Sequence, residues 1–122
     1  FLLLVVYYCI GTEGAFNIGL NEVLIGMSMH HAGIALAKDR LTKPAFQRSV
    51  INGELFSPQD AIAAGFLDRV VPAEQLMDTA QAMATTMKKI NMHAHAKTKL
   101  KVRKDLLEAL DAAIEVDKTI PL

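Results

Sequence analysis

The stretch NGELFSPQDAIAAGFLDRVVP, residues 52–72, carries the clearest structural signals in the chain. Ser-Pro-Gln-Asp at 57–60 predicts a helix start, because it supplies an N-cap hydroxyl, a proline at N1 and an acid near the positive helix end. Gly65 is typical of the residue that follows a helix. Residues 66–71 then predict a brief strand that Pro72 closes. A short helix followed directly by a strand favours an α/β fold.

Two further strands are predicted upstream of this stretch. Residues 1–10, FLLLVVYYCI, are rich in β-branched and aromatic side chains and end at Gly11. This pattern predicts a strand buried on both faces. Residues 16–18 predict a short second strand. Residues 19–31 alternate polar and apolar side chains without a clear period, which indicates a loop of the kind that often carries function.

Helices are predicted over much of the remaining chain. Residues 32–41 are helical in texture, and Pro44 suits the first turn of a second helix that Gly53 would end. Beyond Pro72, two apolar stripes predict two longer helices: one stripe is Leu76, Ala80, Met83 and Met87, and the other is Leu100, Leu107, Leu110 and Ile114. We therefore predict a core unit at residues 1–72 and a helical segment at 73–122 that packs on the core or on another subunit.

Composition excludes several classes of protein. The 122 residues include 13 basic and 13 acidic side chains, so no net charge attracts nucleic acid or an anionic membrane. The single cysteine, Cys9, cannot form an internal disulfide, which favours a reducing compartment. Residues 1–10 lack a signal-peptide pattern and are too short to span a bilayer. We predict no membrane insertion and a cytoplasmic location, with the mitochondrial matrix as the alternative in a eukaryote. The apolar beginning also suggests a natural chain that extends upstream.

Glu22 is the strongest catalytic candidate. It lies in the irregular segment between apolar neighbours, including Leu20 and Val23. A carboxylate held among apolar groups has its charged form disfavoured and can exchange protons near neutral pH. The alternative is an ordinary surface acid whose neighbours face inward. Because most carboxylates are solvated, composition alone favours that alternative by about two to one.

Other polar groups have simpler interpretations. Adjacent helical residues point about 100° apart, so His30 and His31 are poorly placed to chelate one ion, and a helix start is favoured. No spacing predicts a metal site. His93 and His95 lack a local acid.

A basic cluster follows, made up of Lys97, Lys99, Lys101, Arg103 and Lys104. It could cradle a phosphate, but a solvated helix face with ion pairs such as Lys101–Asp105 and Lys104–Glu108 is favoured. Core packing is favoured for Met27, Met29, Met83, Met87 and Cys9.

Two segments resemble one family. Residues 16–26, FNIGLNEVLIG, are similar to the stretch after the central strand of the crotonase superfamily, which includes enoyl-CoA hydratases and isomerases. Residues 52–72 resemble that family's Thr-Gly … Ala-x-x-Ala-x-x-x-Gly-Leu-Val-x-x-Val-Val-Pro segment more specifically. The resemblance extends over essentially the whole chain. It implies the C-terminal part of a crotonase-type ββα spiral, followed by a helical oligomerisation segment.

The resemblance also implies roles for individual residues. Glu22 falls on the family glutamate that moves a proton at the α or γ carbon of an acyl thioester, and Leu20, Gly26 and Gly33 fall in the substrate-binding region. Coenzyme A enters as part of the substrate, with no prosthetic group and no metal. Basic residues of the C-terminal helices, here Lys97 and Lys101, would contact its nucleotide. Family members assemble as trimers or dimers of trimers, and their oxyanion hole comes from upstream loops outside this chain.

Departures from the family pattern narrow the expected reaction. Phe1 stands where many hydratases carry a second glutamate, and Tyr7 and Cys9 stand where Asp and Arg are often seen. Met-His-His-Ala-Gly at 29–33 replaces the usual Pro-Gly-x-Gly-Gly, so the shape of the acyl pocket should differ. One carboxylate suffices for a double-bond shift, whereas hydration is served well by two. Isomerase-type chemistry is therefore slightly favoured over hydration. The alternative is a non-catalytic member that binds acyl-CoA or acts as an oligomeric scaffold.

Overall fold

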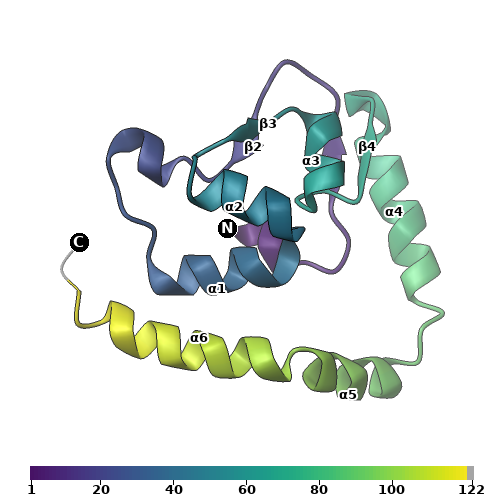
Figure 1. The fold of residues 1–122 in the computed structure, drawn as a ribbon. Coiled ribbons are helices and arrows are strands. Elements are labelled where there is room, and N and C mark those ends of the chain that lie inside the picture. Colours follow the sequence, from purple (N-terminus) through teal and green to yellow (C-terminus); the bar gives the residue numbers. More distant parts are fainter. Residues whose placement is uncertain (121–122) are drawn as a thin grey trace.

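The computed structural model describes residues 1–120 and consists of short strands enclosed by helices (Figure 1). The strands are β1 Ile10–Thr12, β2 Ile18–Gly19, β3 Leu55–Phe56 and β4 Arg69–Val71. The α-helices are α1 His31–Arg40, α2 Lys43–Val50, α3 Pro58–Ala64, α4 Leu76–Met87, α5 Met92–Val102 and α6 Lys104–Asp117. Three 3₁₀ turns complete the order: η1 Leu2–Leu4, η2 Glu22–Ile25 and η3 Ala73–Gln75.

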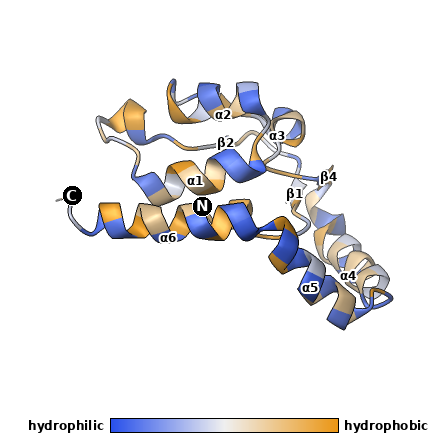
Figure 2. Cartoon of the chain, turned by 60° about the horizontal axis from the view of Figure 1, so that its bottom comes forward, coloured by the Kyte–Doolittle hydropathy of each residue, from blue (hydrophilic) through white to orange (hydrophobic). Residues whose placement is uncertain are grey.

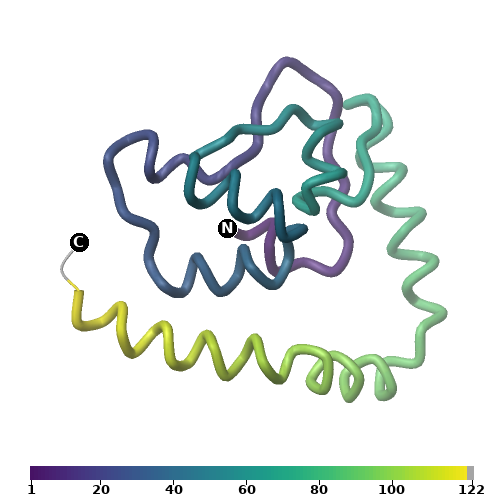
Figure 3. The backbone as a smooth tube through the Cα atoms, viewed as in Figure 1, coloured from purple at the N-terminus to yellow at the C-terminus, as the bar shows by residue number. Residues whose placement is uncertain are grey.

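Two small sheets connect parts of the chain that are far apart in sequence. β1 and β4 are parallel, with Gly11 opposite Val70, and β2 and β3 are antiparallel, with Ile18 opposite Phe56. A Cβ atom on Gly11 would lie 2.6 Å from a methyl carbon of Leu67, so a side chain there would displace the packing beneath the β1–β4 pair. The smooth trace in Figure 3 shows the chain before α1 looping around α2 and α3.

The predicted helix at the centre of the 52–72 stretch is confirmed. Ser57 Oγ accepts a hydrogen bond from the backbone N–H of Asp60 at 3.1 Å, which satisfies one of the unpaired N–H groups at the start of α3. Gly65 ends the helix in the left-handed conformation, with φ at 101°. Arg40 joins α1 to the end of α3. Its Nε donates to the Gly65 carbonyl at 2.7 Å, and its Nη2 donates to the Asp68 carboxylate at 2.8 Å.

One core cluster holds these elements together. Its members lie before β1, after β2, in or next to α1, α2 and α3, in β3, and between α3 and β4. They are Leu4, Cys9, Leu20, Met29, Ala37, Leu41, Ala45, Val50, Phe56, Ala61, Ala64, Phe66 and Leu67. Phe66 is 2% exposed, and its ring lies 5.7 Å from that of Phe56. Burial of this apolar area is the main favourable term that fixes the positions of β2 and α1.

The prediction of a buried strand at residues 1–10 is wrong. Leu2–Leu4 forms a 3₁₀ turn, and strand structure begins only at Ile10. Leu2 is 83% exposed and Tyr7 is 47% exposed, whereas Leu4 and Cys9 are buried. An apolar run fits a helical turn as well as a strand, and within residues 1–120 no strand pairs with residues 1–9. Periodicity alone therefore could not select between the two.

The C-terminal predictions have mixed outcomes. The stripe on α4 is confirmed, because Leu76, Ala80, Met83 and Met87 are its half-buried apolar positions. Of the second stripe, only Leu110 faces the core, because the helix breaks at Arg103 into α5 and α6 and its phase restarts. Leu100 is 60% exposed, and Leu107 and Ile114 are each 44% exposed. The inner side of α6 instead contains Leu106, Leu110 and Ala113.

The helical segment lies against the core. α4 contacts β1, and α6 runs alongside α1 (Figure 2). The prediction of separate units at 1–72 and 73–122 stays a prediction, and the last two residues of the second unit lie outside the described residues. Within the described part of the chain, none of the helices combines the length and apolar character that a membrane span requires.

Candidate active site

Glu22 is positioned by the β2–β3 pair. β2 ends at Gly19, where the backbone approaches β3 so closely that a Cβ atom would lie 2.7 Å from a Leu55 methyl carbon and 3.0 Å from the Glu54 carbonyl oxygen. The next side chain, Leu20, is 5% exposed and belongs to the core. Glu22 follows two residues later as the first residue of η2. The buried Leu20 and the tight strand pair thus hold the backbone immediately before the carboxylate.

The Glu22 carboxylate has an unusual environment. Its Oε2 atom is buried and has no hydrogen-bond partner among residues 1–120. Leaving a buried polar atom unpaired costs on the order of 1–3 kcal/mol, and more when the group is charged. Such atoms are rare in folded proteins and call for a specific explanation, such as a catalytic role. One oxygen of this half-buried side chain is thus removed from solvent, and the choice between a catalytic and a surface acid stays a prediction.

The turn that begins at Glu22 is fixed at both ends. Gly26 ends η2 in the left-handed conformation, with φ at 81°, and the N–H of Met27 donates to the Glu22 carbonyl at 2.8 Å. Leu24 packs over Gly53, where a Cβ atom would lie 2.7 Å from the Leu24 Cγ atom. This contact places η2 over the turn between α2 and β3.

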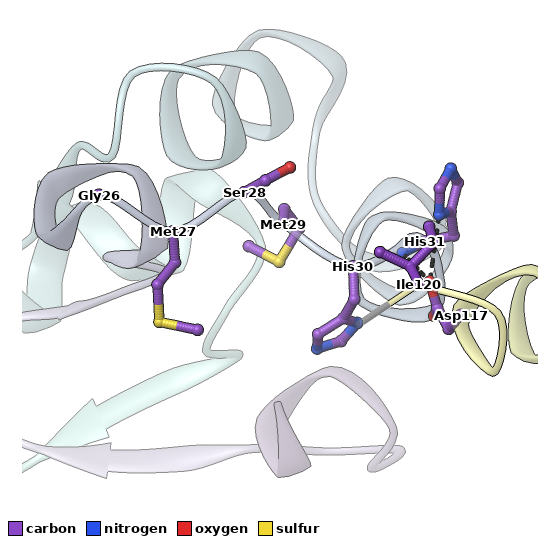
Figure 4. Close-up of a pocket in the computed structure, with 8 residues that line it drawn as sticks. All are labelled: Gly26, Met27, Ser28, Met29, His30, His31, Asp117 and Ile120. Atoms are coloured by element: carbon purple, nitrogen blue, oxygen red, sulfur yellow. Dashed lines mark hydrogen bonds and ion pairs between the residues drawn. The ribbon is translucent and has the colours of Figure 1, made fainter. Parts of the chain in front are cut away.

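A cavity of about 340 Å³ follows this turn (Figure 4). Its walls come from the loop between η2 and α1 and from the end of α6: Gly26, Met27, Ser28, Met29, His30, His31, Asp117 and Ile120. Gly26 lies at this cavity, and its substrate-binding role stays a prediction. Glu22, Leu20 and Gly33 are not among its lining residues. Gly33 is instead buried in the first turn of α1.

Asp117 joins the end of α6 to the start of α1. Its carboxylate accepts hydrogen bonds from the backbone N–H groups of His31 at 2.8 Å and Ala32 at 2.9 Å, and from His31 Nδ1 at 3.1 Å. The bond from Ala32 is the largest cause that lowers the pKa of Asp117 below its ordinary value of 3.8, and the two contacts with His31 act in the same direction. An anion at the positive end of α1 is favourable for the same reason.

His30 and Phe1 occupy the other side of the α1 start. His30 is the N-cap of α1, and its Nδ1 accepts from the N–H of Gly33 at 2.8 Å, so the predicted helix start at this pair is confirmed. The neutral ring then carries its proton on Nε2. The Phe1 ring lies 5.1 Å from the His30 ring. An aromatic side chain thus occupies the position at which the resemblance places a second glutamate in many hydratases.

The basic cluster on α5 divides between two orientations. Lys99 and Arg103 face Tyr7, with the Lys99 Nζ 5.5 Å and the Arg103 guanidinium 4.8 Å from the ring centre. Lys97 and Lys101 are exposed. The expected ion pairs Lys101–Asp105 and Lys104–Glu108 are absent from the described residues, where the four ion pairs lie elsewhere.

The remaining predictions concern sulfur-containing residues and metals. Burial raises the pKa of the Cys9 thiol, against a lowering by Arg40, which agrees with the prediction of an inert cysteine. Met29 is 9% exposed, as expected for core packing, but Met27 is 50% exposed and that prediction is wrong. Met27 lies in the loop after Gly26, outside any helix or strand, where it meets the cavity instead of the core. Within residues 1–120, no group of three or more His, Cys, Asp or Glu side chains could hold a metal ion.

Sequence reasoning missed two contacts of this region. No sequence signal distinguishes Asp117, and the sequence marks Tyr7 only as a departure from a family pattern. Each meets a partner far away in the chain; the His31–Asp117 contact spans 86 residues. No local spacing predicts such contacts, because they depend on how α5 and α6 dock.

The arrangement of these strands and helices matches the C-terminal part of a crotonase-type fold in solved structures. The family model for enoyl-CoA hydratase/isomerase matches residues 2–121. The chain belongs to this family of enzymes.

Individual relatives agree with this assignment. A structure of an enoyl-CoA hydratase/isomerase family protein from Pseudomonas syringae is 64% identical, with a TM-score of 0.97, and the match covers 99% of this chain and 53% of that one. The structure of human mitochondrial delta3-delta2-enoyl-CoA isomerase is 30% identical, with a TM-score of 0.85, over 93% of this chain and 45% of that one. Mouse mitochondrial enoyl-CoA delta isomerase 1 is 29% identical over 91% of this chain. The chain spans only 38% of that mouse protein.

Proposed function

We propose that the protein containing this chain isomerises an unsaturated acyl-CoA thioester, with Glu22 as the residue that carries the proton. The observation that carries the proposal is the buried Glu22 Oε2 without a partner among residues 1–120. In this reaction the carboxylate removes a proton from the α carbon of a 3-enoyl thioester. The double bond moves from the β,γ to the α,β position, and the same proton returns to the γ carbon. Atoms and charge balance without a cofactor, and coenzyme A is part of the substrate.

Two observations favour isomerisation over hydration. Phe1, which the resemblance aligns at or near the second glutamate of many hydratases, packs against His30 and has no carboxylate. The human and mouse relatives are named as isomerases. The enolate formed during the proton transfer needs N–H donors aimed at its oxygen, which are usually the largest source of rate enhancement. The resemblance assigns these donors to loops upstream of residue 1.

The test is Glu22→Gln in the full-length protein, with Glu13→Gln as the matched control at an exposed acid. Glutamine keeps the shape of the side chain but cannot accept the proton. We expect 3-enoyl-CoA isomerisation to fall by about 10²- to 10⁴-fold in the Glu22 variant, as for loss of a general base. Hydration of 2-enoyl-CoA is measured in parallel. Equal isomerisation rates in parent and variant would reject Glu22 as the proton carrier.

A second candidate is a non-catalytic member that binds acyl-CoA or serves as an oligomeric scaffold. It is favoured by one observation: the cavity after η2 lacks Glu22 among its lining residues. This candidate predicts that the full-length protein binds acyl-CoA esters without turning over either 2-enoyl or 3-enoyl substrates. Binding by calorimetry together with both activity assays separates the two functions.

Proposals about coenzyme A contacts and assembly follow from the same function. Lys97 and Lys101 are exposed on α5 and can contact the nucleotide, so the double variant Lys97→Ala, Lys101→Ala should weaken CoA-ester binding.

We propose a homotrimer or a dimer of trimers formed through the helical segment, where Met77, Val102 and Val116 are exposed. Sedimentation of the full-length protein tests the oligomeric state. Cytoplasm or mitochondrial matrix remains the proposed location, and the mouse relative is described as mitochondrial.

A further inference from the structure

The end of α6 and the residues just after it close one side of the cavity, and Asp117 makes the hydrogen bonds there. The Asp117 carboxylate accepts hydrogen bonds from the backbone N–H groups of His31 and Ala32 and from His31 Nδ1. The first turn of α1 has no acid of its own. A carboxylate from 85 and 86 residues away therefore supplies the negative charge that a helix start favours.

This contact connects two opposite walls of the cavity. One wall is the loop at residues 26–31, and the other is Asp117 with Ile120. Figure 4 shows Gly26 and Met27 at one end of the cavity and the joined pair of His31 and Asp117 at the other. Within residues 1–120, the hydrogen bonds between the end of α6 and the start of α1 are all made by Asp117. Its carboxylate therefore supplies the hydrogen bonds that hold the two walls together at this end, beyond the packing of α6 along α1.

The lining fits a flexible apolar group. Met27, Met29 and Ile120 contribute apolar surface, and methionine adapts its shape to irregular or variable contacts. A volume of about 340 Å³ is at the lower end of the range for small-molecule sites. The cavity begins at Gly26, the residue that ends the turn started by Glu22.

We propose that Asp117 is a positioning residue that fastens α6 over this cavity and thereby strengthens the binding of acyl chains long enough to reach it. The inference rests on the proposed function, because it takes the occupant to be the acyl part of a CoA thioester. Loss of the Asp117 contacts frees the end of α6 from the start of α1, so Ile120 no longer has a fixed distance from the 26–31 loop. The cavity then contributes less to the binding free energy of long acyl chains.

The test compares Asp117→Ala and Asp117→Asn with the control Glu108→Ala, which removes an exposed acid from the same helix. Dissociation constants for butanoyl-CoA, octanoyl-CoA and dodecanoyl-CoA are measured by calorimetry on the full-length protein. We expect Asp117→Ala to weaken octanoyl-CoA binding by about fivefold, the change that corresponds to loss of a helix cap, with butanoyl-CoA unchanged. Asp117→Asn should be intermediate, because its amide oxygen still accepts one backbone N–H.

Hydrogen exchange supplies a second readout that requires no ligand. The amides of His31 and Ala32 should exchange faster in Asp117→Ala than in Glu108→Ala. An unchanged preference among the three esters in both Asp117 variants overturns the inference, and so does failure of the parent to bind any ester. Absence of turnover with normal ester binding counts instead against Glu22 as the proton carrier. The two proposals can therefore fail separately.

Discussion

Two regions differ in how well their structure can be predicted from sequence: the β3–α3–β4 region at residues 55–71 and the α5–α6 region at residues 92–117. In the first region, the cap at Ser57 and the left-handed Gly65 lie where local signals predict them. In the second, only Leu110 of the predicted apolar stripe faces the core, and contacts of the helices come from Tyr7 and from the start of α1. Backbone requirements at single residues are thus readable from a sequence, whereas docking between distant helices is not.

The largest expected effect tests the backbone requirement at Gly65. An alanine there must adopt φ near 101° and place its Cβ 2.9 Å from the Arg40 carbonyl oxygen. We expect Gly65→Ala to lower the free energy of unfolding by about 2–4 kcal/mol, from left-handed strain together with overpacking. Denaturant unfolding of the full-length protein measures the change.

Gly26→Ala is the matched control for this prediction. Gly26 also has a positive φ, 81°, but a Cβ atom there has no neighbour within 4 Å. Its cost should be only the strain of about 1–2 kcal/mol. If both variants lose the same free energy of unfolding, the close contact with the Arg40 carbonyl contributes nothing. Both effects would then come from the left-handed backbone alone.

The second prediction concerns the cap of α3. Ser57→Ala removes the acceptor for the Asp60 N–H, and we expect a loss of about 1 kcal/mol in the free energy of unfolding. Ser57→Asp should restore the parent value, because its carboxylate accepts the same hydrogen bond. If aspartate is as destabilising as alanine, the hydroxyl acts through some contact other than the cap.

These two positions explain how much of the fold was predictable. A helix cap and a left-handed glycine act within a few residues, so the sequence of 52–72 predicted α3 and its ends correctly. The run at residues 1–10 gave the wrong element, because apolar content does not distinguish a turn of helix from a strand. For the site, the resemblance to the crotonase family, and not local composition, favoured Glu22, and nothing near Asp117 in the sequence indicated its partner at α1.

The third prediction tests the docking of α5 on Tyr7. Tyr7→Leu removes the aromatic face beneath Arg103 and Lys99, and a loss of about 0.5–1 kcal/mol in the free energy of unfolding is expected at this half-exposed site. Tyr7→Phe keeps the ring and should leave stability unchanged. Should phenylalanine be as damaging as leucine, the hydroxyl and not the ring face would be the stabilising group.

The smallest effect, and the one specific to long-range docking, is the pH dependence contributed by Asp117. Its pKa in the folded protein lies below the ordinary value of 3.8, chiefly because the Ala32 N–H donates to the ionised carboxylate. A lowered pKa means that the folded state binds the proton less readily than the unfolded state. The stabilisation is therefore fully present above the unfolded pKa and is lost as pH falls through the folded pKa.

The difference in melting temperature between the parent and Asp117→Asn should accordingly be constant near neutral pH and shrink below about pH 4. His31 and Lys118 are the nearby basic groups, and Lys118 is paired with Glu115 at 2.7 Å, so Glu115 remains a neighbour in both proteins. Glu108→Gln, which changes an exposed acid of the same helix, should show no such trend. A difference that persists unchanged at low pH would mean that Asp117 stabilises the docked helix through its shape and neutral hydrogen bonds, and the charge at the start of α1 would then contribute nothing to the closure of the cavity.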